Sequence, residues 1–142
     1  RKPSTGTNYF YRWNNATSAW VAITTPGTVT MTGVKKVRMI RYNWIASKLF
    51  LTDGINPAAT YNGTTYTQVT HANAPNSPKY AASFKNHMFY SGMSAAPQEI
   101  IFSEPFDEDA FVSGQGAGSI KVDDTIVGLR AFRGDLFIFC PL

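Results

Sequence analysis

The sequence predicts an all-β fold made of propeller-like repeats of short antiparallel strands, about three blades that would form part of a larger ring. The first observation is internal similarity, because residues 11–23 and 59–69 share an aromatic residue followed by Asn, a short turn and a second aromatic residue. The equivalent residues Trp13 and Tyr61 are 48 positions apart, within the roughly 40–50 residues of a propeller blade. The second observation is that no stretch keeps an apolar i, i+3, i+4, i+7 pattern for three turns, which argues against helices. A β-sandwich is the alternative architecture.

The third observation is a succession of short apolar or alternating segments separated by turn residues, which is typical of strands. Residues 9–13 and 19–23 flank Asn14-Asn15 and predict a hairpin, and residues 28–32 alternate Thr with apolar residues. Residues 37–44 alternate basic and apolar residues and predict another strand. The expected inward residues of that strand are Val37, Met39 and either Tyr42 or Trp44, and the expected outward residues are Arg38 and Arg41.

The rest of the chain continues in the same way. Residues 48–52 read as a short buried strand, and Asn62-Gly63 is a strong hairpin signal because both residues tolerate positive φ. The loop at residues 70–78 is the best candidate for a joint between repeats, whereas residues 106–111 and 114–118 read as turns or loops. The remaining expected strands are 80–84, 87–91, 99–103, 120–122, 126–132 and 136–140.

Composition indicates one globular β-repeat region covering residues 1–142, with 44% hydrophobic and 14% aromatic residues. Charged residues make up only 15%, against about 25% in typical domains, so we expect much of the surface to contact other protein. The single Cys140 leaves no internal disulfide to expect. No apolar run is long enough to span a bilayer and no signal-peptide pattern opens the chain. The start at Arg1 and the stop after a strong strand predict a piece of a longer polypeptide.

Charge is distributed unevenly along the chain. Residues 1–78 hold eight Lys/Arg and one acidic residue, a net +7, whereas residues 79–142 hold five and eight, a net −3. Opposite halves favour pairing with copies or neighbouring proteins, although local loop chemistry is an equal alternative. The candidate interaction residues are the basic Lys35, Lys36, Arg38 and Arg41 and the acidic Glu104, Asp107, Glu108 and Asp109.

No motif in the chain supports catalysis or a cofactor. The acidic segment 104–109 lacks the ligand order of a calcium loop, and its more ordinary interpretation is a solvated loop. Residues 114–118 (GQGAG) precede a strand-like segment and not the helix that a phosphate loop needs. His71 and His87 do not have metal-site spacing. We therefore expect neither an enzyme nor a bound cofactor or metal, and the basic strand fits a protein interface better than nucleic acid.

The second half follows a recognisable order: an apolar strand, a Gly, a loop with Pro, a strand that ends in Ser-x-Pro, an acidic turn, and then Ile-x-Gly-Leu-x-x-Phe-x-x-x-Leu-x-x-Phe. Residues 79–140, with 11–69 as weaker repeats, resemble β-propeller repeats in structural proteins of tailed-phage particles of the cyanophage type. The resemblance implies a structural role in a virion or tail, with contacts to other virion proteins and to copies of the chain. It also implies localisation in the virion after synthesis in the host cytoplasm.

Several aromatic residues and glycines then have expected structural roles. In the last hairpin, residues 126–139 should bury one face, Gly128 should allow close approach between sheets, and Gly134 should form the turn. The aromatic residues of the repeats are expected to fill blade cores, although exposed aromatic rings that stack on sugars would make the chain a glycan-binding module. A glycoside hydrolase that uses the acids at 104–109 is the third alternative. The aromatic residues in question are Trp13, Trp20, Tyr61 and Tyr66.

Overall fold

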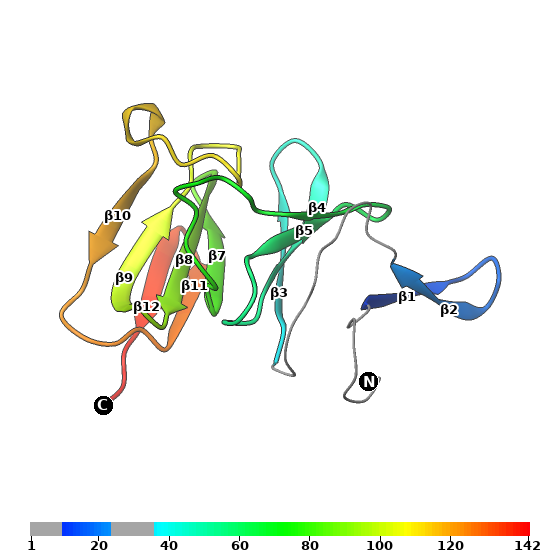
Figure 1. Ribbon diagram of the computed structural model, residues 1–142, viewed down its shortest axis with the longest axis horizontal. Helices are drawn as coiled ribbons and strands as arrows, with labels where there is room; N and C mark the ends of the chain where they lie inside the picture. The colour runs from blue at the N-terminus through cyan, green and yellow to red at the C-terminus, as the bar shows by residue number, and fades with distance from the viewer. Residues whose placement is uncertain (1–9, 24–35) are drawn as a thin grey trace.

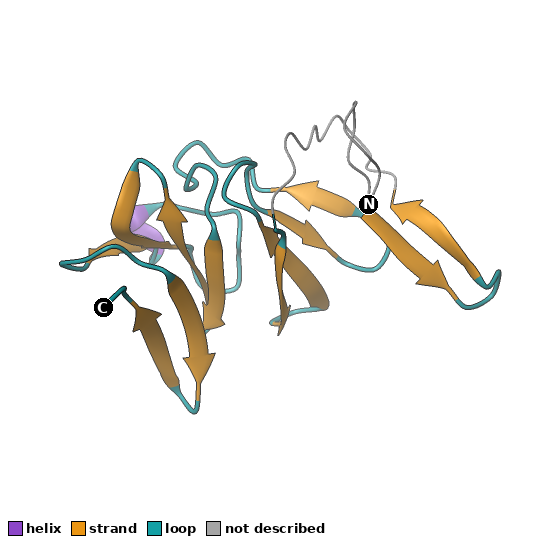
Figure 2. Cartoon of the chain, turned by 90° about the horizontal axis from the view of Figure 1, so that it is seen from below, coloured by secondary structure: helices purple, strands orange, loops and turns teal. Residues whose placement is uncertain are grey.

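The computed structural model describes residues 10–23 and 36–142, and in this part of the chain the fold is all-β, as predicted (Figure 1). The strands pair antiparallel in two four-stranded and two two-stranded sheets, and no closed ring of sheets forms within the described ranges. A short 3-10 turn, η1 (Ser113–Gln115), interrupts the β structure (Figure 2). The strands are β1 (Phe10–Asn14), β2 (Ala19–Ile23), β3 (Arg38–Asn43), β4 (Ser47–Thr52), β5 (Ala59–Tyr61), β6 (Tyr66–Gln68), β7 (Tyr80–Phe84), β8 (His87–Met93), β9 (Ala96–Phe102), β10 (Gly118–Lys121), β11 (Gly128–Phe132) and β12 (Asp135–Phe139).

Each four-stranded sheet is a meander in which every strand pairs with the next one in the chain. The first complete sheet has the order β3-β4-β5-β6, and the second has the order β7-β8-β9-β10. The predicted turn at Asn62-Gly63 connects β5 to β6. Gly63 has a φ of +102°, and the Asn62 Oδ1 atom accepts hydrogen bonds from the backbone N–H groups of Thr64 and Thr65. Local turn chemistry therefore fixes this hairpin.

The two-stranded sheets are the hairpins β1–β2 and β11–β12, which lie before and after the complete sheets in the chain. In the last hairpin, Phe132 pairs with Asp135 across Arg133 and Gly134, whose φ values are +50° and +87°. The turn predicted at Gly134 is thus confirmed. The expectation for Gly128 is wrong, because a Cβ atom there would lie 3.3 Å from the ring of Phe139. That ring belongs to its own paired strand, so the close approach is within the hairpin and not between sheets.

The sheets pack face to face in chain order, with a separate hydrophobic core between each neighbouring pair. Strand β4 shows the principle, since Phe50 and Leu51 point to opposite faces and enter different cores. The central core lies between the two complete sheets and contains Tyr42, Phe50, Ala58, Val69, Met88, Tyr90 and Phe111. The first outer core contains Leu51, Ala59 and Tyr66, with Ile23 of β2 packed against it. The second outer core contains Phe89, Ile100 and Ile126, with Leu129 and Leu136 of the last hairpin packed against it.

The last hairpin buries less of its apolar surface than predicted. Ile126 is buried, and Leu129 and Leu136 are partly buried against the second outer core. The other apolar side chains expected to share that buried face are exposed: Val127, Phe132, Phe137 and Phe139. The reason is that this hairpin has one packed neighbour, whereas the complete sheets have packed neighbours on both faces.

The predicted facing of β3 is wrong at two positions. Met39 was expected inside but is 54% exposed, whereas Arg38 was expected outside but is partly buried. Arg38 lies on the same face as Ile40 and Tyr42, and its guanidinium Cζ atom is 4.7 Å from the centre of the Tyr80 ring. A cation over an aromatic face is favourable, so the cation–π contact with Tyr80 stabilises Arg38 in its partly buried position.

The segment between β6 and β7, residues 69–79, connects one complete sheet to the other and contains the expected joint at 70–78. It is tied to the turn that follows β4. The Gly54 N–H donates to the Pro78 carbonyl at 3.0 Å, and the Ser77 hydroxyl donates to the Ile55 carbonyl at 2.6 Å. The Asp53 carboxylate in turn accepts from the backbone N–H groups of Ile55 and Asn56. These bonds hold the two sheets in a defined relation.

Candidate functional site

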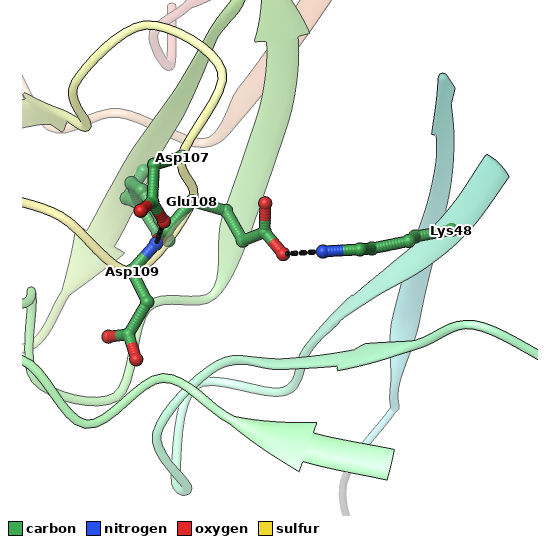
Figure 3. A network of polar contacts seen from close by, with 5 residues as sticks. Lys48, Asp107, Glu108 and Asp109 are labelled. Atoms are coloured by element: carbon green, nitrogen blue, oxygen red, sulfur yellow. Dashed lines mark hydrogen bonds and ion pairs between the residues drawn. The ribbon is translucent and has the colours of Figure 1, made fainter. Parts of the chain in front are cut away.

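The acidic segment 104–109 follows β9 and lies beside the first complete sheet (Figure 3). Asp109 Oδ1 accepts hydrogen bonds from the backbone N–H groups of Thr70 and His71, each at 2.8 Å. Asp107 Oδ1 accepts from the N–H of Asp109 at 2.9 Å, and Glu104 Oε1 accepts from the N–H of Val112 at 3.0 Å. Asp109 therefore ties the loop after β9 to the connection between the two complete sheets, whereas the Asp107 and Glu104 bonds order the loop itself.

Glu108 makes an ion pair that bridges the complete sheets. Its Oε1 atom lies 2.7 Å from Nζ of Lys48 on β4, which Figure 3 shows reaching across from the first sheet. The Glu108 side chain is 9% exposed and that of Lys48 is 34% exposed, so water screens this pair only partly. The backbone carbonyl of Glu108 also accepts a hydrogen bond from the hydroxyl of Tyr90.

Buried tyrosines surround this ion pair. Burial raises the pKa of the Tyr90 hydroxyl well above its ordinary value, and the charge of Glu108 raises it further. Burial likewise raises the pKa of Tyr42, and Glu108 acts in the same direction. Both phenols therefore stay neutral near neutral pH, and their rings pack in the central core.

The geometry assigns the acidic segment a structural task. Each of its four carboxylates accepts a hydrogen bond from a backbone N–H or a lysine. Within residues 10–23 and 36–142, no group of three or more His, Cys, Asp or Glu side chains is placed to hold a metal ion. We name residues 104–109 with Lys48 the inter-sheet clasp, a role that sequence spacing could not reveal because its partners lie 38 to 60 residues away.

The basic candidates do not gather in one patch. Lys35 lies outside the described residues, and Lys36 is exposed just before β3. The guanidinium group of Arg38 packs over the Tyr80 ring. Arg41 is exposed, and its Nε atom donates to the Ser47 hydroxyl at 3.1 Å. Of the three basic candidates that the structure describes, Lys36 and Arg41 are therefore open to contact a partner.

The inner strands form a hollow that the sequence analysis missed. The first strands of three successive sheets lie side by side, since β7 contacts both β3 and β11 (Figure 1). Three consecutive residues from each strand line a hollow of about 360 Å³. We call it the inner hollow, and it is lined by residues 39–41, 81–83 and 129–131. Its two charged residues are Arg41 and Arg130.

The repeat aromatics differ sharply in exposure. Tyr66 is 3% exposed in the first outer core, and Tyr61 is partly buried beside it. Their equivalents in β1–β2, Trp20 and Trp13, are 67% and 48% exposed, with ring centroids 5.6 Å apart in an edge-to-face pair. The two tyrosines therefore have the predicted position in a core, whereas the two tryptophans form an exposed aromatic surface.

Comparison with protein-family models, curated proteins and solved structures finds no match to this chain. Among the described residues, no helix has the length and apolar character needed to cross a membrane.

Proposed function

We propose that the chain is a structural element of a tailed-phage virion or tail, built as an arc of a β-propeller that assembles through protein–protein contacts. The observation that carries the proposal is the arrangement of sheets: two complete meanders flanked by two half-sheets, all packed face to face in chain order. A two-layer sandwich has one core between two sheets, whereas the described part of this chain has three cores between four sheets. Four-stranded sheets arranged radially are the pattern of propeller blades.

The half-sheets explain how such an arc would assemble. Each complete sheet consists of two consecutive hairpins. The hairpin β11–β12 corresponds to the first of these two hairpins. The outer edge of β12 has no partner strand in the described residues, and Phe137 and Phe139 beside it are 45% and 49% exposed. An open apolar strand edge favours pairing with another strand. In the proposal, protein outside this chain, a copy or a neighbouring virion protein, supplies that strand.

Light scattering on a sizing column tests the assembly. We expect the 142-residue chain to form a defined oligomer or aggregate and to melt broadly. The two-residue turn directs the backbone N–H of Ile138 toward the open edge, so Ile138→Pro should block edge pairing while the hairpin survives. Ile138→Val, which keeps the N–H, is the matched control. A wild-type monomer with a sharp cooperative melt would contradict the proposal.

The virion assignment has its own test. Peptides of this chain should be found by mass spectrometry in purified particles of a phage that carries the gene, at a fixed ratio to the major tail proteins. Their presence only in the host lysate would overturn the assignment without affecting the fold.

Glycan binding is the second candidate, and the exposed Trp13–Trp20 pair favours it. Flat aromatic surfaces stack on sugar rings, but the same surface is also what a missing neighbouring blade would cover. A glycan array separates the two functions. Specific glycan signals that disappear in Trp20→Ala support recognition, whereas an array without signals and a Trp20→Ala variant with weaker self-association support assembly.

A further inference from the structure

We propose that two copies of the chain join head to tail, so that β12 of each copy pairs with β1 of the other and completes a four-stranded sheet. The inference rests on the proposed function and deepens it, because it names a second copy as the partner at the open β12 edge. In its described residues each copy has two complete sheets and two half-sheets. Two copies would therefore form a closed ring of six sheets, within the range of about four to eight blades in propellers.

The two half-sheets are complementary halves of one sheet. The hairpin β1–β2 has the sequence layout of β5–β6, the second hairpin of a complete sheet, with Trp20 in the place of Tyr66. The hairpin β11–β12 corresponds instead to a first hairpin, and both it and β7–β8 turn through two residues. In the first complete sheet the two hairpins join by the pairing of β4 with β5. The equivalent junction pairs β12 with β1.

The outer face of the last hairpin repeats a contact that is covered elsewhere in the molecule. Phe84 and Phe89 of the second complete sheet have ring centroids 5.9 Å apart and belong to the second outer core, against which the last hairpin packs. Phe132 and Phe137 hold the equivalent strand positions, with ring centroids 6.4 Å apart, but are 57% and 45% exposed. In the single chain this face is open, and it becomes a core only on association.

The first complete sheet offers a matching uncovered surface on β3. Met39 pairs with Leu51, so both side chains lie on the same face of that sheet. Leu51 is 5% exposed in the first outer core, where Ile23 of β2 packs, whereas Met39 is 54% exposed. The hairpin β1–β2 corresponds to the outer half of a sheet and therefore leaves the inner strand uncovered. In the proposed dimer, β11–β12 of the other copy supplies the inner half and packs over Met39.

The complete sheets also predict the register of the junction. Phe50 pairs with the central β3 residue of the inner hollow and Phe137 pairs with the central β11 residue, so these two are equivalent. Phe50 pairs on its other side with Thr60. Arg12 is the repeat equivalent of Thr60, because each directly precedes its aligned aromatic residue. We therefore expect Phe137 to lie opposite Arg12 of the other copy.

Net charge favours this head-to-tail contact over contact between like ends. Residues 1–78 carry a net charge of +7 and residues 79–142 a net charge of −3. Contact between the first half of one copy and the second half of the other brings opposite charges together, whereas contact between two identical halves brings like charges together.

Disulfide trapping of the whole chain tests the register, with Cys140→Ser removing the single native thiol. Because the Ile138 N–H is directed to the open edge, Phe137 and Arg12 would form a pair without hydrogen bonds, whose Cα atoms lie about 4.5 Å apart. This separation permits a disulfide, so Arg12→Cys with Phe137→Cys should oxidise to a covalent species of two chains. Arg12→Cys with Asp135→Cys, shifted by two residues on the same face, is the control and should cross-link about 10-fold more slowly.

Sedimentation equilibrium tests the packed face. The wild-type chain should have twice the mass of one chain, and Met39→Glu should raise the dissociation constant of the dimer about 10-fold or more. Ile45→Glu is the matched control, because Ile45 is 87% exposed in the turn between β3 and β4 and lies outside the proposed contact. Since both native side chains are exposed, neither variant should lose its fold, which thermal melts verify.

The outcomes separate this inference from the proposed function. An oligomer of another size, equal cross-linking of the two cysteine pairs, or equal weakening by Met39→Glu and Ile45→Glu would overturn head-to-tail pairing and leave assembly through protein contacts standing. A monomeric wild-type chain would contradict both proposals. Absence of the chain from phage particles would overturn the virion assignment alone, since the dimer does not depend on it.

Discussion

The hairpins β5–β6 and β1–β2 have the same sequence layout but different environments. Tyr66 in β6 is 3% exposed, whereas Trp20, its equivalent in β2, is 67% exposed. The hairpin β5–β6 completes a four-stranded sheet, whereas β1–β2 is a sheet of two strands. Burial of a repeat aromatic therefore depends on which neighbours its sheet has. Local sequence specifies the hairpin, and the surrounding sheets decide whether its aromatic face is a core or a surface.

Truncation of Phe89 and of Phe137 tests this comparison with the largest expected difference in the free energy of unfolding. Each lies in the second strand of its hairpin and pairs with the middle residue of the first strand, Ala82 and Arg130 respectively. Phe89 is 8% exposed and Phe137 is 45% exposed. We expect Phe89→Ala to lower the free energy of unfolding by about 3–4 kcal/mol and Phe137→Ala by about 1 kcal/mol or less. Urea denaturation measures both, and equal losses would show that the face of β12 that carries Phe137 is covered in solution.

Alkaline pH should destabilise the complete sheets selectively, because three buried tyrosines lie there. Burial, with a contribution from the charge of Asp53, raises the pKa of Tyr66 from 10 to about 12. Between these values the folded chain keeps a proton that the unfolded chain releases, so stability that is fully present below pH 10 falls as pH rises toward 12. Burial raises the pKa of Tyr42 and Tyr90 in the same direction.

Urea midpoints measured across this pH range, together with tyrosinate absorbance, test the alkaline prediction. Absorbance from the three buried rings should increase together with unfolding. The Tyr66→Phe variant should show a smaller loss of stability between about pH 10 and 12. A midpoint that does not change with pH would show that these phenols ionise equally well in the folded chain.

The inter-sheet clasp should matter less than the core but more than a surface charge. Asp109→Ala removes the acceptor of two backbone N–H groups, and the partial exposure of the site reduces the cost to about 2 kcal/mol. Asp123→Ala, at an exposed position after β10, is the control and should change stability by less than about 0.5 kcal/mol. Hydrogen exchange at Thr70 and His71 should become faster in Asp109→Ala, and unchanged exchange there would disprove the clasp.

Sequence reasoning succeeds here where the information is local. The hairpins at Asn62-Gly63 and Arg133-Gly134 follow from glycines that adopt positive φ, and short strands between turns predict the all-β class. It fails where the partner is distant. Alternation along β3 cannot show that Arg38 rests on Tyr80, because that ring is 42 residues further along the chain.

The same limit applies to the candidate site. The acids at 104–109 are evident from the sequence, but their role depends on Lys48 and on backbone groups near residue 70. The inner hollow has no local sequence feature that marks it. It forms because the first strands of three sheets lie together, and that arrangement follows from how whole sheets pack.

Gly134 offers the smallest and most local test of the comparison. Its φ is +87°, and a Cβ atom at this position would have no other atom within 4 Å, so a side chain there is strained but not crowded. Gly134→Val should cost about 1–2 kcal/mol, whereas Lys121→Ala, at an exposed position, should cost much less. Because β11–β12 is packed on one face only, the loss should appear first as faster hydrogen exchange in that hairpin, with the complete sheets still protected. Similar melting temperatures for the two variants would refute the turn assignment, and simultaneous loss of protection in all sheets would show that the half-sheet is as firmly integrated as the complete ones.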